Sequence, residues 1–135
     1  MAIHEQPMLY SVDLRECTAI STLAPETVAA AFAQALEDAG ATVVQALSHN
    51  FDGAGLTCIL ILAESHAVLH AWPETGTVNI DIFSCSTKLK SLTAIAELGR
   101  SFGAALPDAA AAPVFLVHAF YQLLLGAVSV ITASS

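Results

Sequence analysis

The segment "LTCILILAESHAVLHAWPETGTVNIDIFSC" at residues 56–85 gives the strongest fold signal in the chain. It contains three apolar runs of strand length in succession: "LTCILILAE" (56–64), "HAVLHAW" (66–72) and "TVNIDIFSC" (77–85). Between the last two runs, Pro73 and Gly76 of "PETG" predict a tight reversal. Strands joined this closely are expected to pair as an antiparallel sheet.

The flanking segments supply the other elements. "TVVQALSHN" (42–50) predicts a further strand, and the "FDGAG" that follows it predicts a hairpin turn into 56–64. "APETVAAAFAQALEDAGA" (24–41) predicts an amphipathic helix, with a proline in its first turn and a glycine at its end. A second helix is expected over 87–106 and a first strand over 8–17.

The predicted order is strand, helix, four strands, helix, strand, with no internal repeat or linker. It indicates a single domain over 1–135 of the α+β class: a two-layer α/β sandwich, with an antiparallel sheet and two main helices on one face. Alternation in 77–85 separates two sets of side chains: Val78, Ile80 and Ile82 on one face, and Asn79, Asp81, Phe83 and Cys85 on the other. His66 and His70 also share one side of their strand. If the aliphatic set packs under the helices, both polar sets are expected to face one cleft.

Composition narrows the function. The 135 residues are 56% hydrophobic and 12% charged, so clustered ionisable groups are notable. A net charge of -8 with only four lysines and arginines argues against nucleic acid and suits an amine-bearing small molecule. Three irregularly spaced cysteines predict neither a disulfide framework nor a metal site, and they indicate a reducing cytoplasm. The first 16 residues lack the pattern of a secretory signal, so none is expected.

The C-terminal segment is the least polar part of the chain. Residues 109–135 contain no charged side chain, and 114–133 are long enough to span a bilayer. The proline at 113, the β-branched clusters and the absence of flanking basic residues favour another interpretation. We expect a buried last strand and a tail covered by a partner subunit, not a membrane anchor.

Four residues near the middle of the chain carry proton-transfer or metal-binding chemistry: Ser65, His66, His70 and Cys85. Two histidines and a cysteine are competent zinc ligands, but no fourth ligand is evident and no metal is expected. A Ser/His hydrolase lacks the G-x-S-x-G elbow. The remaining alternative is structural: the histidines are buried and bonded to backbone carbonyls. For His66 taken alone, this is the favoured interpretation.

This stretch and its flanks resemble the prokaryotic S-adenosylmethionine decarboxylases, a family of pyruvoyl-dependent enzymes that cleave their own proenzyme. The matching residues are "SH" at 48–49 with Phe51, "ESHAVLHAWPE" at 64–74 and "DIFSC" at 81–85. The likeness keeps constant spacing from about Asp13 to Cys85, well over half of the chain.

The resemblance implies that Ser65 is consumed to make the cofactor. Its hydroxyl would attack the carbonyl of Glu64, and an ester would form and eliminate, leaving a pyruvoyl group on the new N-terminus. His70 would be the base, and Thr57 would take the place of an assisting hydroxyl residue. In turnover the pyruvoyl ketone would form a Schiff base with the substrate amine and act as an electron sink. Cys85 would then protonate the product.

The resemblance also implies three substrate contacts. Phe51 matches an aromatic residue that stacks on adenine, Glu74 a carboxylate that binds the ribose hydroxyls, and Asp13 an acidic position near the substrate. Each has a structural alternative: a core side chain, a turn carboxylate and a solvated strand residue, respectively. The family further implies a homodimer with active sites at the interface.

The chain departs from the family pattern near the substrate. "QPML" stands at 6–9 in place of a Gly-basic-His start, Thr75 and Thr77 replace aromatic residues, and Ser86 replaces a glycine. The main hypothesis is therefore an S-adenosylmethionine decarboxylase of polyamine and spermidine biosynthesis. A pyruvoyl-dependent arginine or ornithine decarboxylase of the same family is the first alternative. An unprocessed homologue that regulates a partner is the second.

Overall fold

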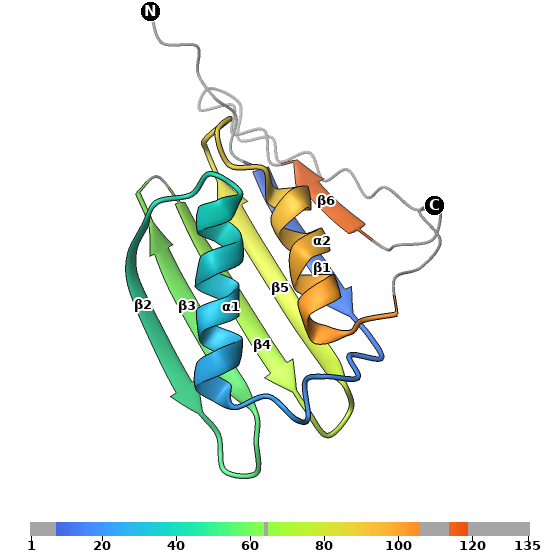
Figure 1. Ribbon diagram of the computed structural model, residues 1–135. Coiled ribbons are helices and arrows are strands. Elements are labelled where there is room, and N and C mark those ends of the chain that lie inside the picture. Colours follow the sequence, from blue (N-terminus) through green and yellow to red (C-terminus); the bar gives the residue numbers. More distant parts are fainter. Residues whose placement is uncertain (1–7, 64, 106–113, 119–135) are drawn as a thin grey trace, which may run out of the picture.

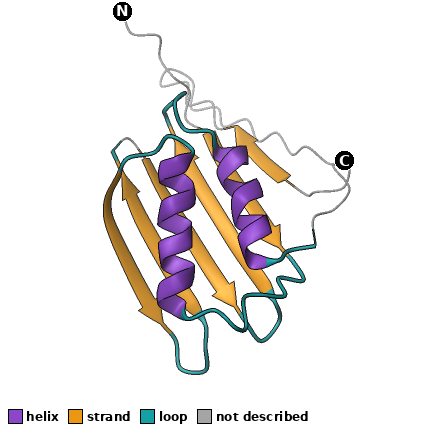
Figure 2. Ribbon diagram, in the orientation of Figure 1, coloured by secondary structure: helices purple, strands orange, loops and turns teal. Residues whose placement is uncertain are grey.

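In this computed structural model, the described residues (8–63, 65–105 and 114–118) form one antiparallel sheet with two helices on one of its faces (Figure 1). The elements in chain order are β1 (Met8–Leu14), α1 (Pro25–Asp38), β2 (Val43–Asn50), β3 (Leu56–Leu62), β4 (Ser65–Trp72), β5 (Thr77–Ser84), α2 (Ser91–Phe102) and β6 (Val114–His118). The predicted element order and the two-layer α+β class are confirmed, and both helices lie on the same side of the strands (Figure 2).

The spatial order of the strands is β2-β3-β4-β5-β1-β6, and every neighbouring pair is antiparallel. β1 therefore lies between β5 and β6, although it is the first strand of the chain. The order puts β4 and β5, which carry most of the family motif, in the middle of the sheet.

The core lies between the sheet and the helices. Alternate side chains of β3, β4 and β5 are buried there, and the apolar ones in β5 are Val78, Ile80 and Ile82, each fully inaccessible. α1 buries the stripe Val28, Phe32, Ala35 and Leu36, whose spacing is that of one helix face. The predicted burial of the aliphatic face of 77–85 under the helices is confirmed.

Several element boundaries differ from the prediction. α1 covers 25–38 of the expected 24–41, and β1 ends at Leu14 before the expected limit at 17. α2 begins at Ser91, not at 87, because two serine side chains bind backbone N–H groups just before it. Ser86 N donates to Ser84 Oγ at 3.0 Å, and Lys88 N donates to Ser86 Oγ at 3.1 Å.

The sheet face opposite the helices has no cover among the described residues, and we call it the open face. It presents the large apolar side chains Leu47, Ile59, Ile61 and Trp72, which are between 38% and 50% exposed. Large exposed apolar side chains on one face of a sheet are characteristic of a contact with another protein chain.

The expected last strand is confirmed as β6, which pairs with β1 at the edge of the sheet. The expected burial of its side chains and the tail after 118 lie outside the described residues. Among the residues described, no helix has the length and apolar character needed to cross a bilayer.

Candidate active site

Five polar side chains form a row across the open face, one from each of five neighbouring strands: His49, Thr57, His70, Asn79 and Asp13. We call this set the polar row. Thr57 Oγ1 and His70 Nδ1 are hydrogen-bonded at 2.8 Å. Asn79 Nδ2 donates to Asp13 Oδ1 at 2.8 Å. Strand register thus places the predicted base, its predicted hydroxyl partner and an acidic residue in one line.

A cavity of about 400 Å³ opens beside the polar row, between the 51–55 turn and the end of β4. It brings together four predicted site residues and one that the sequence analysis did not single out: Phe51, Thr57, His70, Glu74 and Trp72. The volume is in the range of small-molecule sites. Trp72 belongs to the quoted motif, but its place beside the site follows only from the strand pairing.

The structure gives different outcomes for the structural alternatives of Phe51, Glu74 and Asp13. Phe51 is 53% exposed, so its interpretation as a core side chain is wrong. It contacts His49 edge to face, with the ring centroids 4.6 Å apart. Glu74 is an exposed residue in the turn between β4 and β5 and lines the cavity. Asp13 is exposed on β1, and its carboxylate is held by Asn79.

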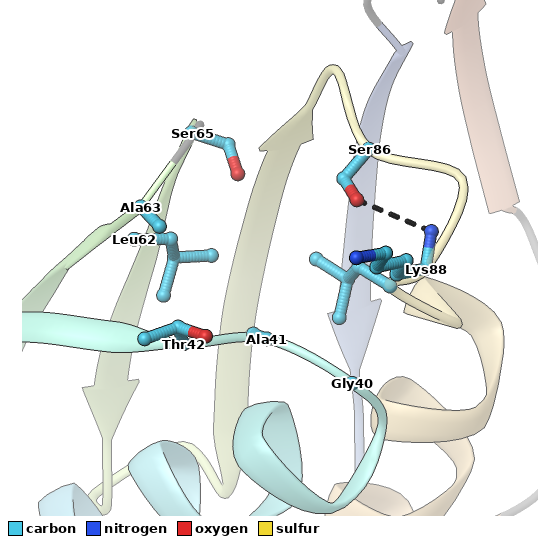
Figure 3. Close-up of a pocket in the computed structure, with 9 residues that line it drawn as sticks. Gly40, Ala41, Thr42, Leu62, Ala63, Ser65, Ser86 and Lys88 are labelled. Carbon is cyan, nitrogen blue, oxygen red and sulfur yellow. Dashed lines mark hydrogen bonds between the residues drawn. The ribbon is translucent and has the colours of Figure 1, made fainter.

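Ser65 lies elsewhere. It is the first residue of β4, pairs with Leu62 and Ser84, and lines a second, smaller cavity of about 120 Å³ on the helix side of the sheet (Figure 3). The preceding Glu64 lies outside the described residues.

A single chain does not bring Ser65 and His70 together. They are five positions apart on β4, which corresponds to about 17 Å along a strand. An odd separation also puts their side chains on opposite faces of the sheet. His70 and Asn79, one from each of the two predicted polar sets, pair on the open face, but of those sets only His70 lines the larger cavity. Ser65, which belonged to neither set, lies on the helix side.

Cys85 is the cysteine best suited to proton transfer. It directly follows β5 at the same end of the sheet as Ser65, and its thiol is free and partly exposed. Burial raises the pKa of the Cys17 and Cys58 thiols, and both side chains lie in the core. Those two cysteines remain protonated packing groups.

His66 is exposed on the open face and stacks on Phe83, with the ring centroids 5.2 Å apart. The alternative of a buried His66 bonded to a backbone carbonyl is therefore wrong. Within 8–63, 65–105 and 114–118, no three His, Cys, Asp or Glu side chains are grouped closely enough to hold a metal ion.

Comparison with known proteins identifies the family. The family model described as S-adenosylmethionine decarboxylase matches residues 8–112. The chain belongs to the S-adenosylmethionine decarboxylase family. The match includes the polar row, the larger cavity, Ser65 and Cys85.

Two cyanobacterial proteins named S-adenosylmethionine decarboxylase proenzyme are among the relatives. The one from Synechococcus sp. is 45% identical over 51 residues, which cover 38% of this chain and 40% of that protein. The one from Prochlorococcus marinus is 37% identical over 70 residues, covering 52% and 56%. The chain thus spans about half the length of these S-adenosylmethionine decarboxylase relatives.

Two further members give longer matches. A proenzyme of the same name from Thermodesulfovibrio yellowstonii is 28% identical over 97 residues and is matched over 72% of each chain. The crystal structure of an adenosylmethionine decarboxylase from Aquifex aeolicus superposes with a TM-score of 0.67 at 20% identity, covering 78% of this chain and 88% of that one. The sandwich described above is therefore also the fold of a solved adenosylmethionine decarboxylase.

Proposed function

We propose that the chain is a self-processing, pyruvoyl-dependent decarboxylase of S-adenosylmethionine, and hence a carboxy-lyase of polyamine synthesis. The observation that carries the proposal is the larger cavity. It combines an aromatic ring (Phe51), a carboxylate (Glu74) and the hydrogen-bonded Thr57–His70 pair, in a volume of about 400 Å³. An aromatic ring and a carboxylate suit a purine and ribose hydroxyls, respectively.

Ser65 fits the proposed origin of the cofactor. It is the first residue of β4, three positions after the last residue of β3, and its hydroxyl is turned into a small cavity rather than packed in the core (Figure 3). A pyruvoyl group at this position supplies an electron sink for removing carbon dioxide from an amino acid. Cys85, at the same end of the sheet, is proposed to donate a proton from Sγ to the α-carbon of the product.

We further propose that the active site is shared between two copies of the chain. Within one copy, His70 is about 17 Å from Ser65 and faces the other way. If two open faces pack about a twofold axis that runs across the strands, the His70 end of each copy lies over the Ser65 end of the other. Each site then has Ser65 and Cys85 from one subunit, and Thr57, His70, Phe51 and Glu74 from its partner.

The chemistry of the open face supports a second copy as its cover. Ile59 and Ile61 are 38% and 40% exposed although their strand, β3, lies between β2 and β4. In the part of the chain that the structure describes, Asp81 Oδ1 is buried without a hydrogen-bond partner. A buried carboxylate oxygen requires a donor, and a facing sheet is placed to supply one.

The interface can be tested with Ile59→Asp. A twofold contact contains each substitution twice, and burying an unpaired carboxylate costs several kcal/mol, so we expect dimer dissociation to become at least about a hundredfold easier. Sedimentation velocity over a range of concentrations measures the change. Leu92→Asp is the control, because Leu92 is 55% exposed on α2, away from the open face. A wild-type chain that sediments as a monomer contradicts the proposed dimer.

Substrate identity is tested by carbon dioxide release from S-adenosylmethionine, arginine and ornithine. We expect S-adenosylmethionine to be preferred. Glu74→Gln is expected to raise KM about tenfold, because a hydrogen bond from a hydroxyl to a charged acceptor is lost. Glu37→Gln, on the exposed side of α1, is the control. A KM for S-adenosylmethionine that Glu74→Gln leaves unchanged contradicts the ribose contact.

Arginine or ornithine decarboxylation is the second candidate, and two features of the chain favour it. Thr75 and Thr77 stand where the family has aromatic residues, and Asp13 adds a carboxylate to the polar row. A carboxylate pairs well with a guanidinium or ammonium group. Carbon dioxide released from arginine or ornithine, and not from S-adenosylmethionine, establishes this candidate. A chain that stays uncleaved and inactive instead supports the regulatory homologue.

A further inference from the structure

The small cavity around Ser65 contains a charged residue that the proposed function does not use. Lys88 lines this cavity together with Ser65, Ser86 and Thr42. Figure 3 shows the Ser65 hydroxyl and the Lys88 side chain directed into the same space from opposite walls. The cavity holds about 120 Å³, room for a few water molecules but not for a nucleoside. Its chemistry therefore concerns Ser65 itself rather than a bound substrate.

The position of Lys88 is fixed by backbone contacts on both sides. Its N–H donates to Ser86 Oγ at 3.1 Å, and Lys90 N donates to Ala39 O at 2.8 Å. The two loops approach so closely that a Cβ on Gly40 would lie 2.4 Å from the Lys88 carbonyl oxygen. Gly40 has a φ of +108°, so this contact requires glycine. The β5–α2 loop is thereby held against the α1–β2 loop, with Lys88 at the cavity wall.

Lys88 is also a cation without an ion-pair partner among the described carboxylates, in a chain that is acidic overall. The sequence has a net charge of -8 and only four lysines and arginines. Arg100 is paired with Glu97 at 2.6 Å, whereas Lys88 makes no ion pair with any described carboxylate. Its ammonium group is available to a negative charge that arises in the cavity.

We propose that Lys88 assists self-cleavage by stabilising negative charge on Ser65 Oγ. The inference rests on the proposed self-processing and adds a residue to it. In the first step Ser65 Oγ loses its proton and bonds to the carbonyl carbon of residue 64. The peptide C–N bond breaks, and the nitrogen of residue 65 gains a proton, which leaves an ester and a free amine. A nearby ammonium favours the oxygen anion that attacks.

The second step returns charge to the same atom. A base removes the α-proton of residue 65, a Cα=Cβ double bond forms, and the Cβ–Oγ bond breaks with its electron pair on Oγ. That oxygen leaves as part of the carboxylate of residue 64; the enamine then takes up water and releases ammonia to give the pyruvoyl group. Lys88 keeps its proton throughout and acts by charge. The oxygen leaves on the helix side, opposite the open face from which the partner's His70 would act.

The test is the rate of self-cleavage after cell-free synthesis, followed by intact mass. Lys88→Met removes the charge and keeps the length of the side chain. Because Lys88 is an exposed residue, water screens part of its effect, and we expect cleavage about tenfold slower rather than the larger loss caused by a buried donor. Lys88→Arg should stay within about threefold of wild type, since it retains the cation.

Lys90→Met is the matched control. Lys90 is two residues further along the same loop, and its Nζ donates to Thr87 O at 3.4 Å. It should cleave at the wild-type rate, and thermal unfolding of all variants checks that they fold. Wild-type kinetics in Lys88→Met, or equal slowing in Lys90→Met, overturns the role of Lys88 alone. A wild-type chain that never cleaves overturns the proposed function and this inference together.

Discussion

Ser65→Ala is expected to abolish both cleavage and decarboxylation. Wild-type protein should give two fragments, residues 1–64 and a pyruvoyl-capped 65–135, whereas the variant should remain one chain of about 14.0 kDa. Alanine has no hydroxyl to attack the preceding carbonyl, so neither the ester nor the ketone forms. Intact-mass and denaturing-gel analysis of purified protein measures the outcome, and a carbonyl reagent detects the keto group.

The control for this substitution is Ser101→Ala, which removes an exposed serine hydroxyl from α2. It should be cleaved and active like the wild type. Fragments produced by Ser65→Ala, or a wild-type chain that is continuous through residue 65 and lacks a carbonyl group, would falsify the proposed origin of the cofactor.

Complementation between two defective chains is the second large expected effect. His70→Ala alone should stay uncleaved because the base is missing, and Ser65→Ala alone because the nucleophile is missing. When both are co-expressed, a mixed dimer contains one intact site, with Ser65 from the first chain and His70 from the second. With random pairing, about half of the His70→Ala chains should be cleaved.

A mass tag on the His70→Ala chain identifies its fragments. Co-expression with the double variant Ser65→Ala/His70→Ala is the control, because that partner provides neither group. If His70 acts on Ser65 of its own chain, co-expression rescues nothing. The distance of about 17 Å along β4 and the opposite faces of the two side chains make that outcome unexpected.

The local sequence was sufficient to predict the layers of this protein. Alternation in 56–85 has a period of two, which each strand expresses without reference to its neighbours, so the buried set Val78, Ile80 and Ile82 was identified correctly. Helix α1 was predicted equally well from the spacing of its apolar residues. Element ends were not, since the start of α2 depends on serine side chains that compete for backbone N–H groups.

The candidate site was predictable only in part. The motif at 64–74 indicated the residue types and the family, which the match over 8–112 confirms. It did not show that Ser65 and His70 belong to different ends and faces of one sheet, because a motif read as a string conveys closeness in sequence and not direction in space.

Strand register and loop packing, which are non-local, determined which site residues are neighbours. Asp13 meets Asn79 beside His70 because β1 inserts next to β5. Lys88 shares a cavity with Ser65 because the β5–α2 loop rests on the α1–β2 loop at Gly40. Side-chain type and the alternation of buried and exposed residues are local properties that can be read directly from the sequence. Which of those residues become neighbours depends on hydrogen bonds and van der Waals contacts between segments far apart in it, and those form only when the sheet and helices assemble.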